Sequence, residues 1–268
     1  MKKEAEIIVL GCGNSTGVPA IGNYWGDCDP KEPKNIRTRS SIAIKTENTT
    51  IVIDTGPDFR QQMNRENIAK LDAVLFTHQH NDHVMGIDEL RVLKFRNKME
   101  NIPIYGNLDT IEDLEQRFLY LFKGGDHKLY PPILESNIIP IDAYNKTNRI
   151  GDIHFKPFEQ DHGSCKTIGY RFGQFAYSVD ILDLDQNAID ALKGIKTWLV
   201  DCAAYKDNQN AVHAGIDKIM KLNKEIKAEH VILTSLSLSA DYQSLTKELP
   251  NGYLPAYDGL RIKETISK

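Results

Sequence analysis

The feature that most constrains this sequence is a histidine-rich segment that directly follows a short apolar run. Residues 71–76 have the length and composition of a buried strand, and the chain continues as Thr77-His78-Gln79-His80-Asn81-Asp82-His83. The first two histidines are separated by one residue. At this spacing a loop can direct both imidazoles to one point, whereas a helix cannot. A solvated polar turn is the plain alternative. Such a cluster is seldom structural, so the segment predicts a metal site at a strand end.

The donor types in this segment limit which metal it holds. Imidazole nitrogen and carboxylate oxygen suit Zn, Mn or Fe(II), and the segment offers no thiolate that would demand a softer metal. One metal does not use all of these groups comfortably once donors from elsewhere are added. The pattern therefore favours two metals.

The rest of the chain alternates predicted strands and helices. Strands are expected at 7–10, 41–45, 50–54, 71–76 and 102–105 in the first half, with helices at 58–70, 87–95 and 110–122. The second half repeats this rhythm, with strands at 138–141, 153–158, 167–172, 175–179, 197–201 and 230–234 and helices at 184–192 and 212–223. No linker of biased composition separates the halves. We expect a single domain over residues 1–268, an α/β (α+β) fold of two mixed β-sheets packed face to face with helices outside.

Two further metal-ligand candidates follow predicted strands in the second half. Asp161-His162-Gly163 comes after the strand at 153–158, and Asp180 comes after the strand at 175–179. A single histidine at a strand end is more often a hydrogen-bonded loop residue. His162 and Asp180 are therefore candidate metal ligands only because the first cluster is present.

Composition excludes some functions and leaves others open. The longest early apolar run has four residues and no stretch approaches the ~18 that span a bilayer, so we expect a cytoplasmic protein with no membrane partner. Lys plus Arg number 33 against 37 Asp plus Glu, giving a net charge of −4. Nucleic-acid binding is therefore open through a local basic patch but not favoured. A homodimer is a further expectation.

The histidine segment resembles the metallo-β-lactamase superfamily, whose HxHxDH signature stands here as His78, His80, Asp82 and His83. The resemblance covers nearly the whole chain and is greatest to the branch that contains the phosphonate-utilisation cyclic phosphodiesterase. It implies a four-layer αββα metallo-β-lactamase-like sandwich. The other positions that carry it are Gly11 to Pro19, Arg37, Arg39, Asp54, His162, Asp180 and Tyr257-Asp258-Gly259.

The resemblance also implies roles for individual residues. His78, His80 and His162 would hold one metal, Asp82 and His83 a second, with Asp180 bridging the two. Asp54 would orient a ligand histidine from behind. Asp82 and His213 are the implied catalytic residues, and Arg37 and Arg39 would form a fork for substrate phosphate. For His213 a surface position near a helix start is an equally weighted alternative, and for the two arginines ordinary surface charge is the more frequent outcome.

The function implied is that of a metal-dependent hydrolase. With one or two Zn or Mn ions per chain, a metal-activated hydroxide would cleave a small cyclic or nucleotide-like phosphodiester. The superfamily usually adds a late histidine, whereas residues 233–238 here contain none and Ser235 or Ser237 takes its place. A degenerate phosphate- or nucleotide-binding protein with little turnover is therefore one alternative. An RNA-processing nuclease is another, although the long arm typical of that branch has little room in the 18 positions between His162 and Asp180 (180 − 162).

Overall fold

The first strand, β1 (Lys3–Gly11), shows why this chain forms layers. Its side chains alternate between the two faces of the sheet, and from Ile7 to Leu10 both faces are apolar. Ile7 and Val9 pack into one hydrophobic cluster, whereas Ile8 and Leu10 pack into another, and all four are fully buried. A strand that is apolar on both faces needs a covering layer on each side.

Two β-sheets supply the inner layers. The computed structural model describes residues 3–125, 130–207 and 209–267, and within these each sheet has seven strands. The first sheet has the order β14-β1-β2-β3-β4-β5-β6 and the second the order β13-β12-β11-β10-β9-β8-β7. The remaining strands of the first sheet are β2 (Ser41–Lys45), β3 (Thr50–Ile53), β4 (Ala73–Leu75), β5 (Ile102–Gly106), β6 (Leu134–Ile138) and β14 (Arg261–Ser267). The second contains β7 (Asn148–Ile150), β8 (Ile153–Asp161), β9 (Lys166–Phe172), β10 (Phe175–Ser178), β11 (Thr197–Asp201), β12 (His230–Thr234) and β13 (Tyr253–Pro255).

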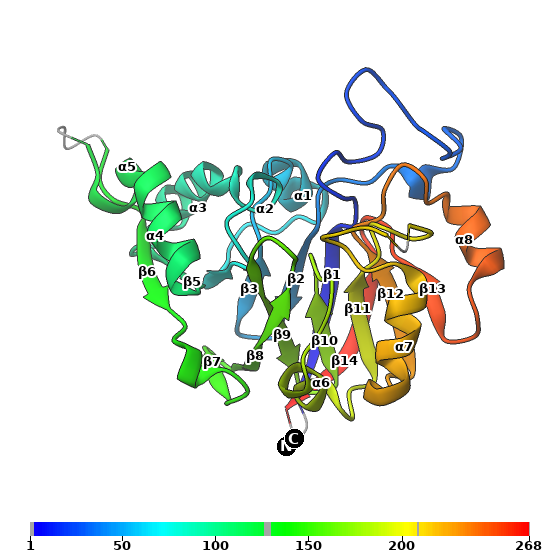
Figure 1. Ribbon diagram of the computed structural model, residues 1–268. Helices are drawn as coiled ribbons and strands as arrows, with labels where there is room; N and C mark the ends of the chain where they lie inside the picture. The colour runs from blue at the N-terminus through cyan, green and yellow to red at the C-terminus, as the bar shows by residue number, and fades with distance from the viewer. Residues whose placement is uncertain (1–2, 126–129, 208, 268) are drawn as a thin grey trace.

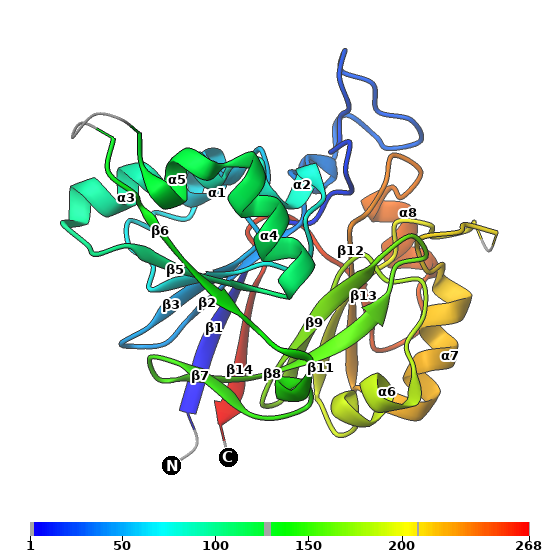
Figure 2. The same ribbon diagram turned by 60° about the vertical axis from the view of Figure 1, so that its left-hand side comes forward.

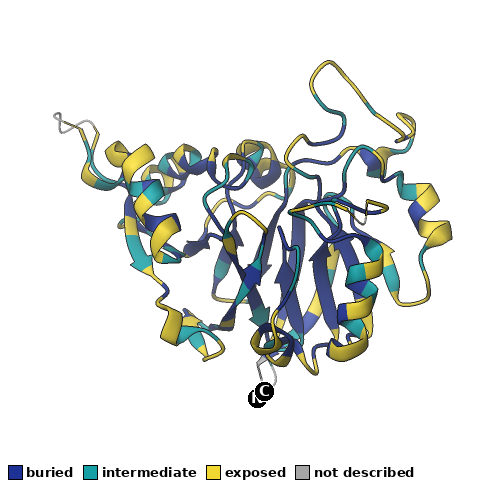
Figure 3. Cartoon of the chain, viewed as in Figure 1, coloured by how far each residue is buried: buried dark blue, intermediate teal, exposed yellow. Residues whose placement is uncertain are grey.

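Helices cover the outer face of each sheet (Figures 1 and 2). The first sheet is covered by α1 (Phe59–Arg65), α2 (Asn81–Val84), α3 (Leu90–Asn97), α4 (Leu108–Arg117) and α5 (Leu119–Lys123). The second is covered by α6 (Gln186–Leu192), α7 (Ile216–Ile226) and α8 (Tyr242–Glu248). One apolar cluster lies between the sheets and one lies under each helical layer, and the buried strands of Figure 3 show the same layering. The expected αββα sandwich of two mixed sheets is confirmed.

Each sheet is antiparallel in one half and parallel in the other. β3 to β6 pair in parallel in the first sheet, and β10 to β13 pair in parallel in the second. The carboxyl ends of parallel strands meet at one edge, which is where ligands bind in open α/β sheets. The long loop between β1 and β2 rises above this edge at the top of Figure 1.

Several element boundaries differ from the sequence expectation. The strand expected at 138–141 lies earlier in the chain, as β6, because its pairing with β5 runs from Leu134 to Ile138, opposite the end of β5 at Gly106. The helix expected at 110–122 breaks at Phe118 into α4 and α5. The helix expected at 212–223 begins only at Ile216, after Gly215, so that His213 lies in a loop.

Some elements were not predicted from the sequence: α2, α8, β7, β13 and β14. In the part of the chain that the structure describes, no helix combines the length and the apolarity that crossing a membrane requires.

Candidate metal centre

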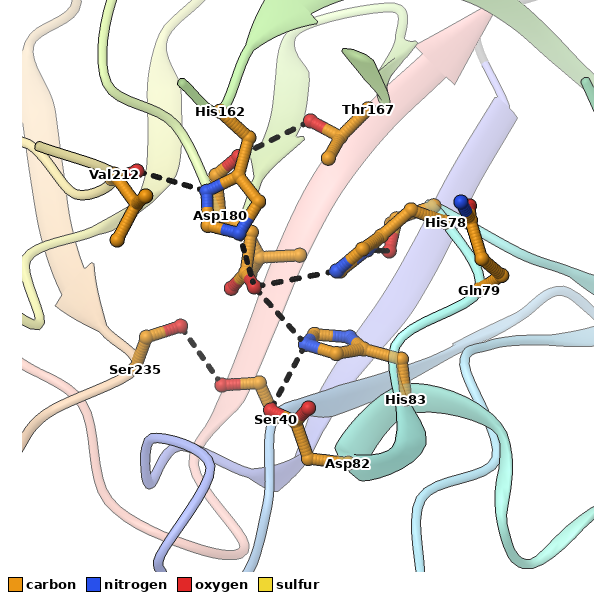
Figure 4. A network of polar contacts seen from close by, with 12 residues as sticks. Ser40, His78, Gln79, Asp82, His83, His162, Thr167, Asp180, Val212 and Ser235 are labelled. Carbon is orange, nitrogen blue, oxygen red and sulfur yellow. Dashed lines mark hydrogen bonds and ion pairs between the residues drawn. The ribbon is translucent and has the colours of Figure 1, made fainter. Parts of the chain in front are cut away.

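The metal centre is built from residues that directly follow strands of both sheets. His78 comes after β4, and His80 caps the short helix α2, which contains Asp82 and His83. From the second sheet, His162 follows β8 and Asp180 follows β10. Figure 4 shows the side chains of His78, His83, His162 and Asp180 pointing toward one another.

Asp180 lies at the middle of this cluster. Its Oδ2 atom is 3.3 Å from His78 Nε2 and 3.4 Å from both His83 Nε2 and His162 Nε2. The expected ligand atoms fall into two groups, and within each group they lie within 4.8 Å of one another. The first group is His78, His80, His162 and Asp180, and the second is Asp82, His83 and Asp180. A third group of the same kind, Asp180, Asp201 and His213, shares Asp180 with both. The structure thus brings together the six residues expected to hold metal, in the division that the resemblance implied.

The other ring nitrogen of three histidines is already hydrogen-bonded, which fixes the tautomer. His83 Nδ1 lies 2.8 Å from Asp54 Oδ2 and His162 Nδ1 lies 2.8 Å from the Val212 carbonyl oxygen, and both partners only accept. Each of these Nδ1 atoms therefore carries the proton. Their Nε2 atoms face the cluster, where each can bind a metal ion in place of a second proton.

His78 has the same tautomer for a less direct reason. Thr77 Oγ1 lies 3.0 Å from His78 Nδ1, but its single proton is donated to Asp54 Oδ2 at 2.8 Å. The hydroxyl can only accept from His78, so Nδ1 again bears the proton. Within the described residues, the buried Nε2 of His78 has no hydrogen-bond partner. Imidazole nitrogens that converge on one carboxylate, with one of them buried and without a hydrogen-bond partner, fit divalent metal ions.

Asp54 lies behind the ligands, at the end of β3. It is fully buried and accepts from Thr77 N and Thr77 Oγ1, each at 2.8 Å, as well as from His83. Its backbone is left-handed, with φ of 66°. The structure therefore gives Asp54 the contacts needed for the orienting role expected of it.

The electrostatics of the site favour a cation. Burial lowers the pKa of His78 to about 4, with a further contribution from the charge of His83, so the His78 ring is neutral at pH 7. Burial also opposes charge on His83, but the carboxylates of Asp180, Asp54 and Asp82 together raise its pKa well above 6.5. These carboxylates leave an excess of negative charge that divalent ions neutralise.

His213 lies beside this cluster, in the loop before α7. Its ring centroid is 5.0 Å from that of His162, and its Nδ1 is 2.7 Å from Asp201 Oδ2. Burial alone would lower the pKa of His213, but the Asp201 carboxylate outweighs it and raises the pKa to about 9. The side chain is half-buried, 22% exposed, just before the start of α7.

Asp201 was missed by the sequence analysis. It ends β11, is fully buried, and accepts from Ile181 N at 3.1 Å and Ala203 N at 2.8 Å. The signal that singled out Asp180, an aspartate ending an apolar strand, applies equally to Asp201.

Arg37 does not form the phosphate fork expected of it. Its side chain is buried, and it donates to the Ala240 carbonyl at 2.6 Å, the Ser237 carbonyl at 3.3 Å and Asn35 Oδ1 at 2.9 Å. These donors are engaged in joining the β1–β2 loop to the segment after β12. Arg37 therefore stabilises the loops above the sheets rather than facing substrate.

Arg39 has a different environment from Arg37. Its Nε lies 3.1 Å from Asp58 Oδ2, and its side chain is 26% exposed. It does not line the cavity at the metal centre, and its substrate-binding role stays a prediction.

The cluster opens into a polar cavity of about 220 Å³. Besides His213 and the metal-ligand candidates other than His78, hydroxyl and amide groups of the loops line it. These are contributed by Asn14, Ser15, Ser40, Ser164 and Ser235. A cavity of this size and polarity suits a phosphate group and a small substituent.

Comparison with known proteins places the chain in a class. A family model described as the β-lactamase superfamily domain matches residues 49–234, and the chain belongs to that superfamily. The expected membership is confirmed. The fold and the His/Asp cluster together define a member of this superfamily with a cluster that could hold divalent metal ions.

Within the superfamily, the chain is similar to a diphosphatase of the PhnP family of known crystal structure. The two are 30% identical with a TM-score of 0.87, and the match covers 99% of each chain. This agrees with the branch indicated by the sequence. Human tRNase Z, short form, shares the fold at a TM-score of 0.69 with 14% identity, over 98% of this chain and 100% of that one.

Curated relatives are similar over part of their length. An octanoyltransferase from Porphyromonas gingivalis is 30% identical over 255 residues, which are 94% of this chain and 50% of the relative. A ribonuclease Z from Gemmatimonas aurantiaca is 28% identical over 155 residues, 57% of this chain and 47% of the relative. The chain thus spans about half the length of the first of these relatives, and the match to the second covers about half of that protein.

Proposed function

We propose that this protein is a metal-dependent phosphodiesterase that hydrolyses a small cyclic or nucleotide-like phosphodiester. The observation that carries the proposal is the convergence of protonated-Nδ1 imidazoles on Asp180, at the floor of a small polar cavity. Similarity to a PhnP-family diphosphatase and to ribonuclease Z supports chemistry at phosphorus.

His78, His80, His162 and Asp180 would hold one ion, and Asp82, His83 and Asp180 would hold the other. We propose Zn²⁺ or Mn²⁺ as the ions. When bound, they would supply Lewis acidity at the phosphoryl group and readier deprotonation of water. Asp54 and Thr77 keep the imidazoles in the tautomer that binds metal.

His213 is proposed to serve the leaving group. Its Nδ1 is held by Asp201, so Nε2 is the nitrogen left to face the cavity that His213 lines. From this position it would donate a proton to the departing oxygen. General acid catalysis of this kind is typically worth ~10² to 10⁴ in rate.

Hydrolysis of bis(4-nitrophenyl) phosphate tests the proposal. Protein prepared with Mn²⁺ or Zn²⁺ should release 4-nitrophenol, and His78→Ala and Asp180→Ala should each reduce release to the buffer rate. His154→Ala is the matched control, because His154 lies in β8 and lines a different cavity. Unchanged turnover in both site variants would overturn the proposal, and an inactive wild-type protein that binds phosphate would favour the phosphate-binding alternative.

A nuclease is the second candidate, favoured by the similarity to ribonuclease Z. Against it, the interval between His162 and Asp180 is filled by β9, β10 and their short connections. The discriminating measurement is binding of a structured RNA at low and moderate salt. A nuclease contacting phosphates should bind at low salt and lose affinity steeply as salt rises. Absence of binding at both concentrations would dismiss it.

A further inference from the structure

Two buried serines at the metal centre form a hydrogen-bond relay with a fixed direction. Ser40 Oγ donates to the Gly13 carbonyl at 2.9 Å, and it lies 3.0 Å from Ser235 Oγ. A hydroxyl has one proton, so Ser40 can only accept from Ser235. The proton of Ser235 is thereby committed to Ser40. What Ser235 presents to the cavity is an oxygen lone pair.

Ser235 shares an unusual backbone conformation with the two acidic residues Asp54 and Asp180. Ser235, Asp54 and Asp180 each come directly after or within two residues of a strand end, and their φ angles are 54°, 66° and 51°. Left-handed backbone is uncommon outside glycine and gathers at functional sites. The other non-glycine residues with positive φ in the described chain are three asparagines and two lysines, Asn23, Asn67, Lys98, Asn145 and Lys227.

Ser235 also lies where a ligand is needed. It is 1% exposed and lines the same cavity as Asp82, His83 and Asp180, and Figure 4 shows it with Ser40 on the side of Asp82. We propose that Ser235 Oγ is a neutral oxygen ligand of the cation held by Asp82, His83 and Asp180. This inference rests on the metal-dependent function proposed above.

The two cation positions then differ in chemistry. One has three imidazole nitrogens and one carboxylate, whereas the other has one imidazole, two carboxylates and the Ser235 hydroxyl. Oxygen-rich sets favour Mn²⁺ over Zn²⁺ relative to imidazole-rich sets. A neutral hydroxyl also binds less strongly than an imidazole. We therefore expect a tight position that accepts Zn²⁺ and a weaker position that prefers Mn²⁺.

Titration with Mn²⁺ alone, followed by the electron paramagnetic resonance signal of free Mn²⁺, tests the assignment. Wild-type protein should show two classes of site. Ser235→Ala should weaken the weaker class by roughly tenfold or more, in the range found when a ligand or its support is lost, and leave the tighter class unchanged. The unchanged tighter class shows that the variant is folded.

Two further variants sharpen the result. Ser237→Ala is the matched control, because Ser237 lies in the same loop but pairs with Ser239 and does not line the cavity. It should match the wild type. Ser40→Ala leaves Ser235 in place and frees its proton, so it should weaken the same class by a smaller factor.

A Ser235→Ala variant with wild-type Mn²⁺ binding in both classes would overturn the assignment, as would a wild-type protein with one class of site. The readout needs no substrate, so the two proposals fail separately. Altered Mn²⁺ binding with no hydrolysis of any phosphodiester would contradict the function alone. Hydrolysis with unaltered binding would contradict the role of Ser235 alone.

Discussion

At the scale of single residues, the metal centre depends on hydroxyl protons that are already donated to neighbouring acceptors. Thr77 gives its hydroxyl proton to Asp54, so His78 must protonate Nδ1, and Ser40 gives its proton to Gly13, so Ser235 must donate to Ser40. In both pairs a hydroxyl outside the ligand set fixes which atom its neighbour presents to the metal-ligand cluster. Residues that contact the ligands without binding metal therefore determine the site as strictly as the ligands themselves do.

Asp54→Asn should lower metal affinity without removing a ligand. An amide nitrogen in place of Oδ2 would face the protonated Nδ1 of His83, setting donor against donor. We expect a loss of roughly 10- to 100-fold in metal affinity, measured by competition with a chelator. Thr77→Ser keeps the hydroxyl and should lose far less. Equal affinity in Asp54→Asn and the wild type would show that the contact does not orient His83.

His213→Ala should affect substrates according to their leaving group. A proton donor matters little when 4-nitrophenolate departs and much when an alkoxide departs. We expect kcat to fall by roughly 10² or more with an alkyl ester and by far less with bis(4-nitrophenyl) phosphate. Asp201→Asn should follow the same pattern more weakly, because it leaves the imidazole in place. Equal losses with both substrates would argue for a role other than proton donation.

At the scale of elements, strand ends supply the ligands and loops close the cavity. Arg37 joins the β1–β2 loop to the segment after β12, and Asp258 accepts from Cys12 N at 3.0 Å and Thr38 N at 2.9 Å. Gly13 and Ser40, which belong to the relay, lie next to these anchored residues. The loops are therefore part of the site and not a cover over it.

Asp241 tests how much one such anchor contributes. It caps α8 through Ser244 N at 2.9 Å, and accepts from Asn35 Nδ2 at 2.7 Å and Asp29 N at 3.2 Å. Burial is the largest single influence and raises the pKa of Asp241, but these hydrogen bonds together outweigh it and lower the pKa from 3.8 to about 2. We expect Asp241→Ala to lower the free energy of unfolding by ~1 to 2 kcal/mol at pH 7.

The sign of the pH dependence follows from the lowered pKa. The ionised Asp241 carboxylate contributes its full stability above pH 3.8, and this contribution is lost as pH falls through 3.8 toward 2. Urea unfolding of wild type and variant should therefore give a difference that is constant from pH 7 to pH 5 and shrinks below pH 4. A difference that grows on acidification would contradict the cap.

The candidate ligands could be recognised in the sequence because their signal is local. His78, His80, Asp82 and His83 lie within one segment, and its spacing is readable without knowing the fold. Arg37 was misjudged because the acceptors that bury it lie about 200 positions away along the chain. The direction of the Ser40 relay likewise depends on Gly13 and Ser235, which only the packed sheets bring together. Short edge strands such as β7 and β13 carried too few residues for a pattern.

At the scale of the whole molecule, the metal centre lies across the junction of the two sheets. His78 and His83 extend from the first sheet, whereas His162 and Asp180 extend from the second. The sheets otherwise contact mainly through an apolar cluster, which has no directional preference. Ions bound at this junction would add directional links between the layers.

Metal removal should therefore destabilise the whole fold and not only the site. A ligand that binds only the native state stabilises it by about 2.7 kcal/mol at 100 times its Kd. We expect Tm to fall when Mn²⁺- or Zn²⁺-loaded protein is treated with a chelator, and to recover when metal is restored.

His162→Ala should remove most of this metal-dependent difference in Tm, because it deletes one of the two ligand residues, His162 and Asp180, that extend from the second sheet. His154→Ala, in the same strand but lining another cavity, should keep it. The measurement is a thermal melt of each variant with metal and with chelator. If the chelator leaves the wild-type Tm unchanged while it removes the metal, the ions do not join the sheets, and the apolar cluster alone holds them together.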